Sequence, residues 1–133
     1  MIEKYSINTN KQSEMIHITH KVRQAVQKTG IQEGIAVIYC PHTTAGITIN
    51  EGADPDVVHD ILMKFDKIFP WKDKDYLHAE GNSAAHIKAS CMGSSNTIPI
   101  TGGQLLLGTW QSIYFCEFDG PRHRTYYVKV MEG

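Results

Sequence analysis

The sequence predicts an α+β fold, organised as a single compact domain over residues 1–133. Segments with strand character outnumber helical ones, and the two or three predicted helices do not alternate regularly with strands as in βαβ proteins. A chain of 133 residues is also long enough to bury roughly two-thirds of its unfolded surface without disulfides. We therefore expect a mixed or antiparallel sheet with two to three helices.

The chain begins with a predicted strand and a predicted helix. Residues 2–8 alternate weakly between apolar and polar side chains, which favours a strand. Residues 19–28 are predicted to be helical, with Thr19 as the cap and Gly30 as the stop. The apolar residues of this helix recur at helical spacing, and they are Ile18, Val22, Ala25 and Val26.

Two neighbouring strands are predicted next. Residues 34–40 form a short, apolar and β-branched run, which is typical of a buried strand. Residues 46–50 alternate, and we expect them to form the adjacent strand. The polar connection over residues 41–44 lies between these two apolar segments.

The helix that starts at Pro55 has the clearest signals in the chain. Asp54 is placed to cap it, Pro55 fits the first helical position, and Asp56 adds negative charge at the positive end of the helix dipole. The apolar stripe predicted to face the core is Val57, Val58, Ile61, Leu62 and Phe65.

The second half of the chain is predicted to be richer in strands. After a loop at residues 70–73, an extended segment over 78–82 would place His78, Glu80 and Asn82 on one side, because side chains alternate along a strand. Asn82 or Ser83 is then expected to cap a short helix that runs to Met92. The remaining predicted strands are 97–100, 104–107, 110–118 and 124–131, with a turn at 119–121.

Composition excludes several classes of protein. Lys plus Arg (13) nearly balance Asp plus Glu (14), whereas a general nucleic-acid binder presents an excess of basic residues. The first residues lack a signal-peptide pattern, and no apolar run approaches the ~20 residues of a membrane span. Cys40, Cys91 and Cys116 form no CxxC pair. We expect a cytoplasmic protein with reduced thiols and no nucleic-acid or membrane partner.

Three of the seven histidines stand out from the others. His42, His78 and His86 each lie in a dense polar segment flanked by small residues, which allow another part of the chain to approach closely. The remaining histidines lie in polar or charged surroundings, and we expect them at the surface: His17, His20, His59 and His123.

The three selected histidines are candidate metal ligands. Three neutral imidazoles with an open fourth position would form a zinc site, and Glu51 or Glu80 could serve as a ligand or hold an imidazole in place. The sequence contains no HExxH motif or compact zinc-finger spacing, so ordinary hydrogen-bonded loop histidines are the alternative.

A second group of residues is a candidate anion site. Hydroxyls and backbone amides in small-residue loops can cradle a phosphate, and Arg can bind it with two hydrogen bonds. The alternative is ordinary turn chemistry with solvated arginines. The candidate residues for binding a substrate or anion are Thr43, Thr44, Asn50, Asn82, Lys88, Ser90, Arg122 and Arg124.

Separate motifs in this sequence resemble the YjbQ-like family, and the resemblance covers nearly the whole chain. The motifs are CPHTTAGITINEGADPD over residues 40–56, HAEGNSAAHIKAS over 78–90, GTWQSI over 108–113 and EFDGPRHR over 117–124. Several separated motifs in the same order make a chance match very unlikely.

The resemblance implies a compact α+β fold that assembles as a homotrimer, with a site built around His42, Glu51, His78 and His86. The apolar run around Leu105–Leu107, within residues 98–110, is compatible with either a core or an oligomer surface. Members of the family are described as secondary thiamine-phosphate synthases. The candidate catalytic residues are Glu51, Glu80 and His42.

The implied reaction joins an aminopyrimidine-methyl pyrophosphate to a thiazole phosphate, so the partner would be a small phosphorylated metabolite. Mg²⁺ is the usual companion of a pyrophosphate substrate, whereas a histidine trio suits zinc. This mismatch leaves two alternatives open. One is a metal-dependent hydrolase of a phosphorylated metabolite, and the other is a non-enzymatic trimeric binder of a small anionic metabolite.

Overall fold

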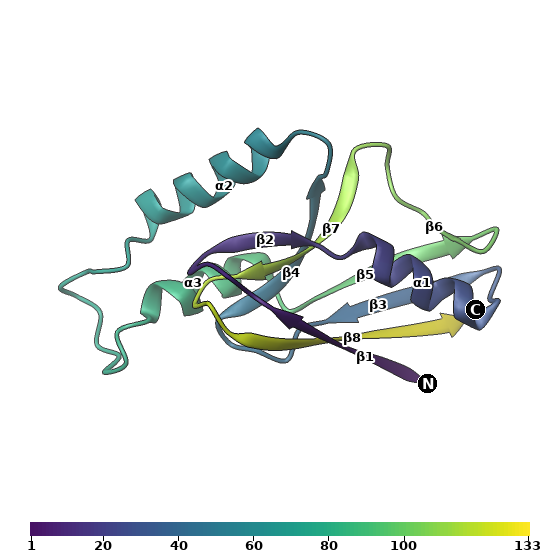
Figure 1. The fold of residues 1–133 in the computed structure, drawn as a ribbon, viewed down its shortest axis with the longest axis horizontal. Coiled ribbons are helices and arrows are strands. Elements are labelled where there is room, and N and C mark those ends of the chain that lie inside the picture. The colour runs from purple at the N-terminus through teal and green to yellow at the C-terminus, as the bar shows by residue number, and fades with distance from the viewer.

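A computed structural model describes all residues from 1 to 133 and shows two antiparallel sheets with three helices (Figure 1). The five-stranded sheet has the order β1 (Ile2–Asn8), β8 (His123–Glu132), β3 (Gly34–Tyr39), β5 (Ser95–Thr101) and β6 (Gln104–Leu105). The three-stranded sheet has the order β2 (Glu14–His17), β7 (Gln111–Glu117) and β4 (Ala45–Glu51). The predicted α+β class is confirmed.

The three helices have separate positions around the sheets. Helix α1 (Thr19–Thr29) packs against the core between the sheets, and α2 (Pro55–Ile68) lies along the outer side of the three-stranded sheet (Figure 1). Helix α3 (Ser83–Met92) follows a long loop and packs near the start of β4. None of these helices has the length and apolar character that a membrane span requires.

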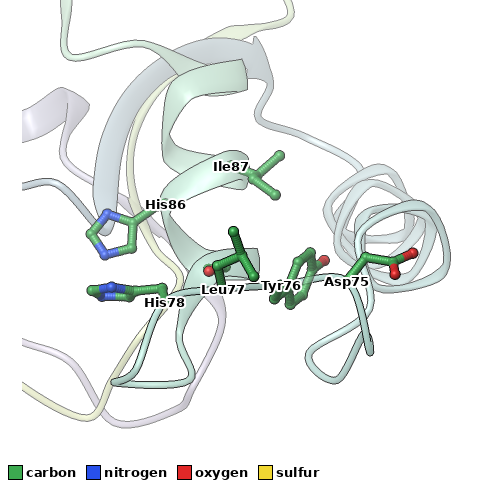
Figure 2. A pocket seen from close by; sticks show the side chains of 7 residues that line it. Asp75, Tyr76, Leu77, His78, His86 and Ile87 are labelled. Atoms are coloured by element: carbon green, nitrogen blue, oxygen red, sulfur yellow. The ribbon is translucent and has the colours of Figure 1, made fainter.

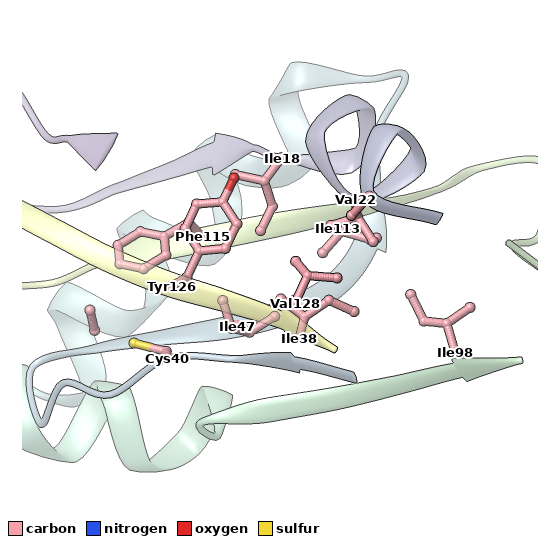
Figure 3. Close-up of a cluster of buried hydrophobic side chains, with 12 residues drawn as sticks. Ile18, Val22, Ile38, Cys40, Ile47, Ile98, Ile113, Phe115, Tyr126 and Val128 are labelled. Carbon is pink, nitrogen blue, oxygen red and sulfur yellow. The ribbon is translucent and has the colours of Figure 1, made fainter. Parts of the chain in front are cut away.

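The main core lies between the two sheets (Figure 3). Alternate residues of β7 explain it: Ile113 and Phe115 face the five-stranded sheet, where they meet Tyr126 and Val128 of β8. The rings of Phe115 and Tyr126 have centroids 5.9 Å apart. Ile18 and Val22 close the core from the α1 side.

A smaller core covers the other face of the three-stranded sheet. Tyr114, Cys116 and Phe118 point away from the main core, because strand side chains alternate, and they meet small residues of α3. Both faces of β7 are therefore buried. The apolar stripe of α2 covers this second core with Val58, Ile61, Leu62 and Phe65.

Helix termini partly follow the predictions. The Asp54 side chain accepts a hydrogen bond from the Asp56 amide, as expected for α2, and Gly30 ends α1 in the left-handed region at φ 68°. The cap of α1 is Ile18 and not Thr19. The Thr19 hydroxyl instead accepts a hydrogen bond from the Ile113 amide at 2.8 Å, which ties α1 to β7.

One predicted segment differs from the structure, and one strand was not predicted. Residues 78–81 form a turn in which the Gly81 amide donates to the His78 carbonyl at 3.1 Å, so the expected extended segment is wrong. Gly81 has φ 75°, a conformation that glycine adopts without strain and that breaks a strand. The sequence analysis also missed β2, which pairs with β7.

Candidate functional site

Two of the three selected histidines contact each other directly. His86 lies on α3, His78 lies on the loop before it, and their rings meet edge to face with centroids 5.4 Å apart (Figure 2). The closest carboxylate to His78 is Glu80, whose Oε2 lies 4.0 Å from His78 Nε2. The His78 and Glu80 side chains are both substantially exposed, and His86 is half-buried, so the site is open to solvent on the His78 side.

A cavity of about 570 Å³ opens beside this histidine pair. It combines polar groups with an aromatic ring and aliphatic side chains, so it can hold a small organic molecule with a few directed hydrogen bonds. The residues that line it are Asp75, Tyr76, Leu77, His78, Ser83, His86 and Ile87 (Figure 2).

A second cavity of about 490 Å³ shares His86 with the first. It is lined by His42 and Thr43 from the β3–β4 loop and by Ser90 and Ser94 from the far half of α3 and the residues after it. His86 therefore lies at the boundary between two hollows, and it is the only residue common to both linings.

His42 completes the end of a sheet through its ring. The register of β3 and β8 stops at Tyr39 opposite Tyr127, so its continuation would place Pro41, which has no N–H, opposite Thr125. The His42 Nε2 atom takes this place. It lies 3.0 Å from the Thr125 amide nitrogen and 3.1 Å from the Thr125 carbonyl oxygen.

The surroundings of His42 favour a neutral ring. Burial and the nearby positive charge of Arg124 lower the pKa of His42, and this outweighs the Thr125 backbone and Glu117, which act in the opposite direction. A neutral Nε2 accepts the Thr125 N–H, which leaves Nδ1 as the protonated nitrogen. His42 thus has a structural contact that occupies Nε2.

Backbone contacts fix α3 against the strands that carry His42. The Ile47 amide donates to the Gly93 carbonyl at 3.0 Å, and the Cys40 amide donates to the Ser94 carbonyl at 2.8 Å. This approach requires a glycine at position 46, where an added Cβ would lie 2.6 Å from the Gly93 carbonyl oxygen. His86 and His42 therefore keep a defined separation.

A buried ion pair supports the same end of the core. Because strand side chains alternate, Glu117 points to the same side of β7 as Phe115, and Arg124 points to the same side of β8 as Tyr126. Both side chains therefore face the space between the sheets. Arg124 donates from Nε and Nη2 to the two carboxylate oxygens of Glu117, and Nη2 also donates to Thr44 Oγ1 at 2.8 Å. Thr9 Oγ1 donates to Glu117 Oε1 at 2.8 Å.

The structure uses several of the predicted anion-binding residues internally. Arg124 and Thr44 belong to the buried network around Glu117, and Arg124 is only 5% exposed. Lys88, 2% exposed, forms an ion pair with Asp66 of α2. These side chains do not line any cavity beside the histidines.

Arg122 and Asn82 are brought together by one carboxylate. Arg122 Nη2 lies 3.0 Å from Asp119 Oδ2, which also accepts a hydrogen bond from Asn82 Nδ2 at 2.9 Å. Asn82 is buried, and its Oδ1 atom has no hydrogen-bond partner. Of the predicted anion-binding residues, only Thr43 and Ser90 line a cavity that contains a histidine.

Glu51 and Asn50 lie at the opposite end of β4 from the histidines. Ala45 begins this strand beside the second cavity, and six further residues separate it from Glu51, about 20 Å at ~3.3 Å per residue. The Glu51 carboxylate accepts hydrogen bonds from the Ala53 and Asp54 amides, just before α2. A single chain therefore does not bring Glu51 to His42, His78 or His86.

No three His, Cys, Asp or Glu side chains stand together in an arrangement that could hold a metal ion. His86 contacts the ring of His78 and only shares the lining of the second cavity with His42, whose Nε2 atom is occupied by Thr125. The donor set of one chain, as it is arranged, does not fit the tetrahedral three-histidine site that the sequence analysis expected.

Some residues around the histidines were missed by the sequence analysis. Tyr76 lines the first cavity, and Lys72 and Lys74 line a further hollow next to His78. The alternation of lysine and aspartate over residues 72–75, three residues before His78, is the signal that could have drawn attention to this loop.

Fold and site together define a class: a compact α+β domain with two antiparallel sheets and an exposed histidine site along one helix. Within this class, residues 3–133 match the family model described as UPF0047 protein YjbQ-like. The chain belongs to this family, which confirms the resemblance seen in its motifs.

Relatives and solved structures support this membership over the full chain. The UPF0047 protein YugU of Bacillus subtilis is 56% identical over 131 residues, covering 98% of this chain and 99% of its own. A crystal structure of a family protein from Clostridium acetobutylicum has a TM-score of 0.95 at 58% identity, covering 97% and 99%. A YbjQ-like protein of Sulfolobus solfataricus has the same TM-score at 33% identity, covering 100% and 97%.

Proposed function

We propose that this chain is an enzyme that places two small substrates, at least one of them phosphorylated, in the adjacent cavities that share His86, and joins them. The position of His86 in the wall of both cavities carries this proposal. Two reactants whose reacting ends meet at one side chain, where the two cavities adjoin, gain the rate advantage of proximity. The reaction that the family resemblance suggests, thiamine-phosphate synthesis, needs such an arrangement.

The chemistry can be assigned to the chain's own groups. A carbon–nitrogen bond forms between the thiazole nitrogen and the methylene carbon of the pyrimidine, and the carbon–oxygen bond to pyrophosphate breaks. Pyrophosphate leaves with the bonding electron pair, so donors near the leaving oxygen stabilise the developing charge. The ring N–H groups of His78 and His86 supply such donors in this proposal.

One observation favours hydrolysis of a phosphate ester as the second candidate. Glu80 Oε2 lies 4.0 Å from His78 Nε2, and a carboxylate beside an imidazole can help it remove a proton from water. This reaction would need only the cavity beside His78. A non-enzymatic binder of a small anion is the outcome that remains if no substrate turns over.

We still predict a zinc site, but with two of the three histidines as its ligands. His78 and His86 contact each other, while His42 is engaged by Thr125. We expect that any zinc bound by the protein depends on His78 and His86 and is retained by His42→Ala. Elemental analysis of the three alanine variants measures this, and no step of the proposed reaction is assigned to a metal.

The deciding experiment incubates purified protein with both substrates and, separately, with a panel of phosphate esters, each with and without a chelator. Thiamine phosphate and pyrophosphate formed in equal amounts would support the proposal. Phosphate released from an ester without a second substrate would support the hydrolase. Binding with no turnover of any substrate would contradict both enzymatic functions.

A further inference from the structure

A third cavity, of about 410 Å³, extends the histidine site away from α3. It shares Tyr76 and His78 with the first cavity, so the three hollows follow one another from the loop before α3 along this helix. Its lining combines two lysines with two aromatic rings: Trp71, Lys72, Asp73, Lys74, Tyr76, His78 and Gly81.

Local hydrogen bonds hold this loop in shape. The Tyr76 hydroxyl donates to the Pro70 carbonyl at 2.9 Å, and the Tyr76 amide donates to the Asp73 carbonyl at 3.1 Å. Asp73 Oδ1 accepts a hydrogen bond from the Asp75 amide at 2.9 Å. The Asp73 carboxylate is thus used by the backbone of its own turn.

The two lysines of this cavity have no carboxylate partner. Of the other cations that the sequence suggested for an anion, Lys88 and Arg124 are buried in ion pairs, and Arg122 is paired with Asp119. No ion pair of the chain involves Lys72 or Lys74. Their ammonium groups are therefore the free cationic donors beside the histidine pair.

Recognition here would be local, because the loop over residues 71–81 carries no excess of positive charge. Asp73, Asp75 and Glu80 outnumber Lys72 and Lys74, so long-range attraction does not bring an anion to this cavity. Charge-assisted hydrogen bonds from two ammonium groups, which are short and strong, can do so at close range. Trp71 and Tyr76 provide ring faces for an organic group attached to the anion.

We propose that the cavity formed by residues 71–81 binds the phosphate or pyrophosphate group of the substrate through Lys72 and Lys74. This inference rests on the proposed function, and it specifies which end of the substrate lies in which cavity. The anionic group occupies the lysine cavity next to His78, and the organic part attached to it extends past Tyr76 toward His86.

Calorimetric titration with inorganic pyrophosphate tests this assignment without requiring turnover. We expect the wild-type chain to bind pyrophosphate and the double variant K72Q/K74Q to bind it at least tenfold more weakly, since each lost charged hydrogen bond costs roughly ten- to a hundredfold in affinity. The matched control is K21Q/K28Q, which removes two exposed lysines from α1 and should retain wild-type affinity.

Two outcomes would overturn the inference: pyrophosphate bound equally well by K72Q/K74Q, or no binding by the wild-type chain. Circular dichroism of each variant confirms that the fold is intact. The proposed function is tested separately by His86→Ala. This variant should lose product formation and still bind pyrophosphate in the same titration. Retained product formation would contradict the proposed function and leave the lysine site untouched.

Discussion

At the scale of single residues, the Glu117–Arg124 pair shows how charge is kept inside this core. Burial by itself raises the pKa of Glu117, but hydrogen bonds from Arg124, the Asp119 backbone and Thr9 outweigh it and hold this pKa below its usual value. The carboxylate therefore stays ionised between the sheets. Thr9 and the Asp119 amide also donate to this carboxylate, and Thr44 accepts from Arg124, so the pair joins β7 and β8 to three loops.

Replacing Glu117 with Gln should destabilise the fold strongly, because Arg124 would be left buried without its counter-charge. Breaking one side of a buried pair costs about 3–5 kcal/mol in the free energy of unfolding, which chemical denaturation measures. Replacing both residues with apolar ones, as in E117L/R124M, should cost less than the single change. A Glu117→Gln variant as stable as wild type would contradict this role.

His42 should titrate below the ordinary histidine value of 6.5, because burial and Arg124 lower its pKa. The unfolded chain then takes up a proton first as the pH falls, so stability decreases below about pH 6.5. NMR titration measures the pKa. His42→Ala should reduce this pH dependence, and the exposed His20→Ala should preserve it. A His42 pKa above 6.5 would show that the ring is not held neutral by its contacts.

Residue type alone gave a misleading impression of Arg124. Arg122 and Arg124 stand two positions apart beside a turn, which resembles a clamp for an anion. The strand that starts at His123 instead directs Arg124 into the core, where it meets a glutamate that lies seven residues earlier. No local pattern distinguishes a buried arginine from a substrate-binding one, because its partner is decided by the packing of two sheets.

At the scale of elements, the position of α3 relative to β4 determines the histidine site. Gly46→Ala would place a methyl group 2.6 Å from the Gly93 carbonyl oxygen and 3.1 Å from Met92 Cβ. We expect a loss of about 1–3 kcal/mol in stability and a displacement of α3. Chemical denaturation and the chemical shift of the His86 amide measure the two effects.

Gly30→Ala is the matched control for this change. It adds strain at φ 68° but meets no atom within 4 Å, so it should cost about 1–2 kcal/mol and leave the His86 signal in place. If Gly46→Ala leaves the His86 amide unshifted, the close contact does not position α3.

Elements with strong local signals were predictable, and those that depend on context were not. Asp54, Pro55 and an apolar stripe identified α2, because caps and periodicity are local properties. The turn at 78–81 was read as extended because its hydrogen bond and the positive φ of Gly81 leave no periodic pattern. Strand β2 is four residues long and is defined by pairing with β7, 97 or more residues away.

At the scale of the whole molecule, one face of the five-stranded sheet is uncovered. Helix α1 and the three-stranded sheet pack on its other face, and large apolar side chains remain accessible on this one. In the segment over residues 98–110, expected to be either core or oligomer surface, Ile98 and Ile100 are buried, whereas Leu106 and Trp110 are exposed by 59% and 65%. The exposed residues of the uncovered sheet include Ile2, Ile35, Tyr39 and Met131.

Exposed apolar area of this kind favours self-association, and the family resemblance specifies a homotrimer. We expect light scattering on the purified chain at micromolar concentration to give three times the mass of one 14.9 kDa chain. Replacing exposed apolar residues with charged ones, as in Y39E/M131E, should not disturb the core. A wild-type monomer at the same concentration would contradict the trimer.

The candidate site was only partly visible in the sequence. His42, His78 and His86 were selected because they lie in polar segments with small neighbours, and the fold brings His86 into contact with His78 and into the same cavity lining as His42. Glu51 stands in the same motif as His42, yet an extended strand separates the two by its full length. Residues that are close together in a sequence motif lie far apart when the chain between them is an extended strand, and the motif itself does not show this.

The proposed role of His86 is tested most directly by the rate of thiamine-phosphate formation by His86→Ala at saturating concentrations of both substrates. We expect kcat to fall at least a hundredfold, as for loss of a group that acts on the reacting atoms, while His59→Ala on the exposed face of α2 retains the wild-type rate. Circular dichroism should show both variants folded. A folded His86→Ala variant with the wild-type kcat would contradict the claim that the reaction occurs at the boundary of the two cavities.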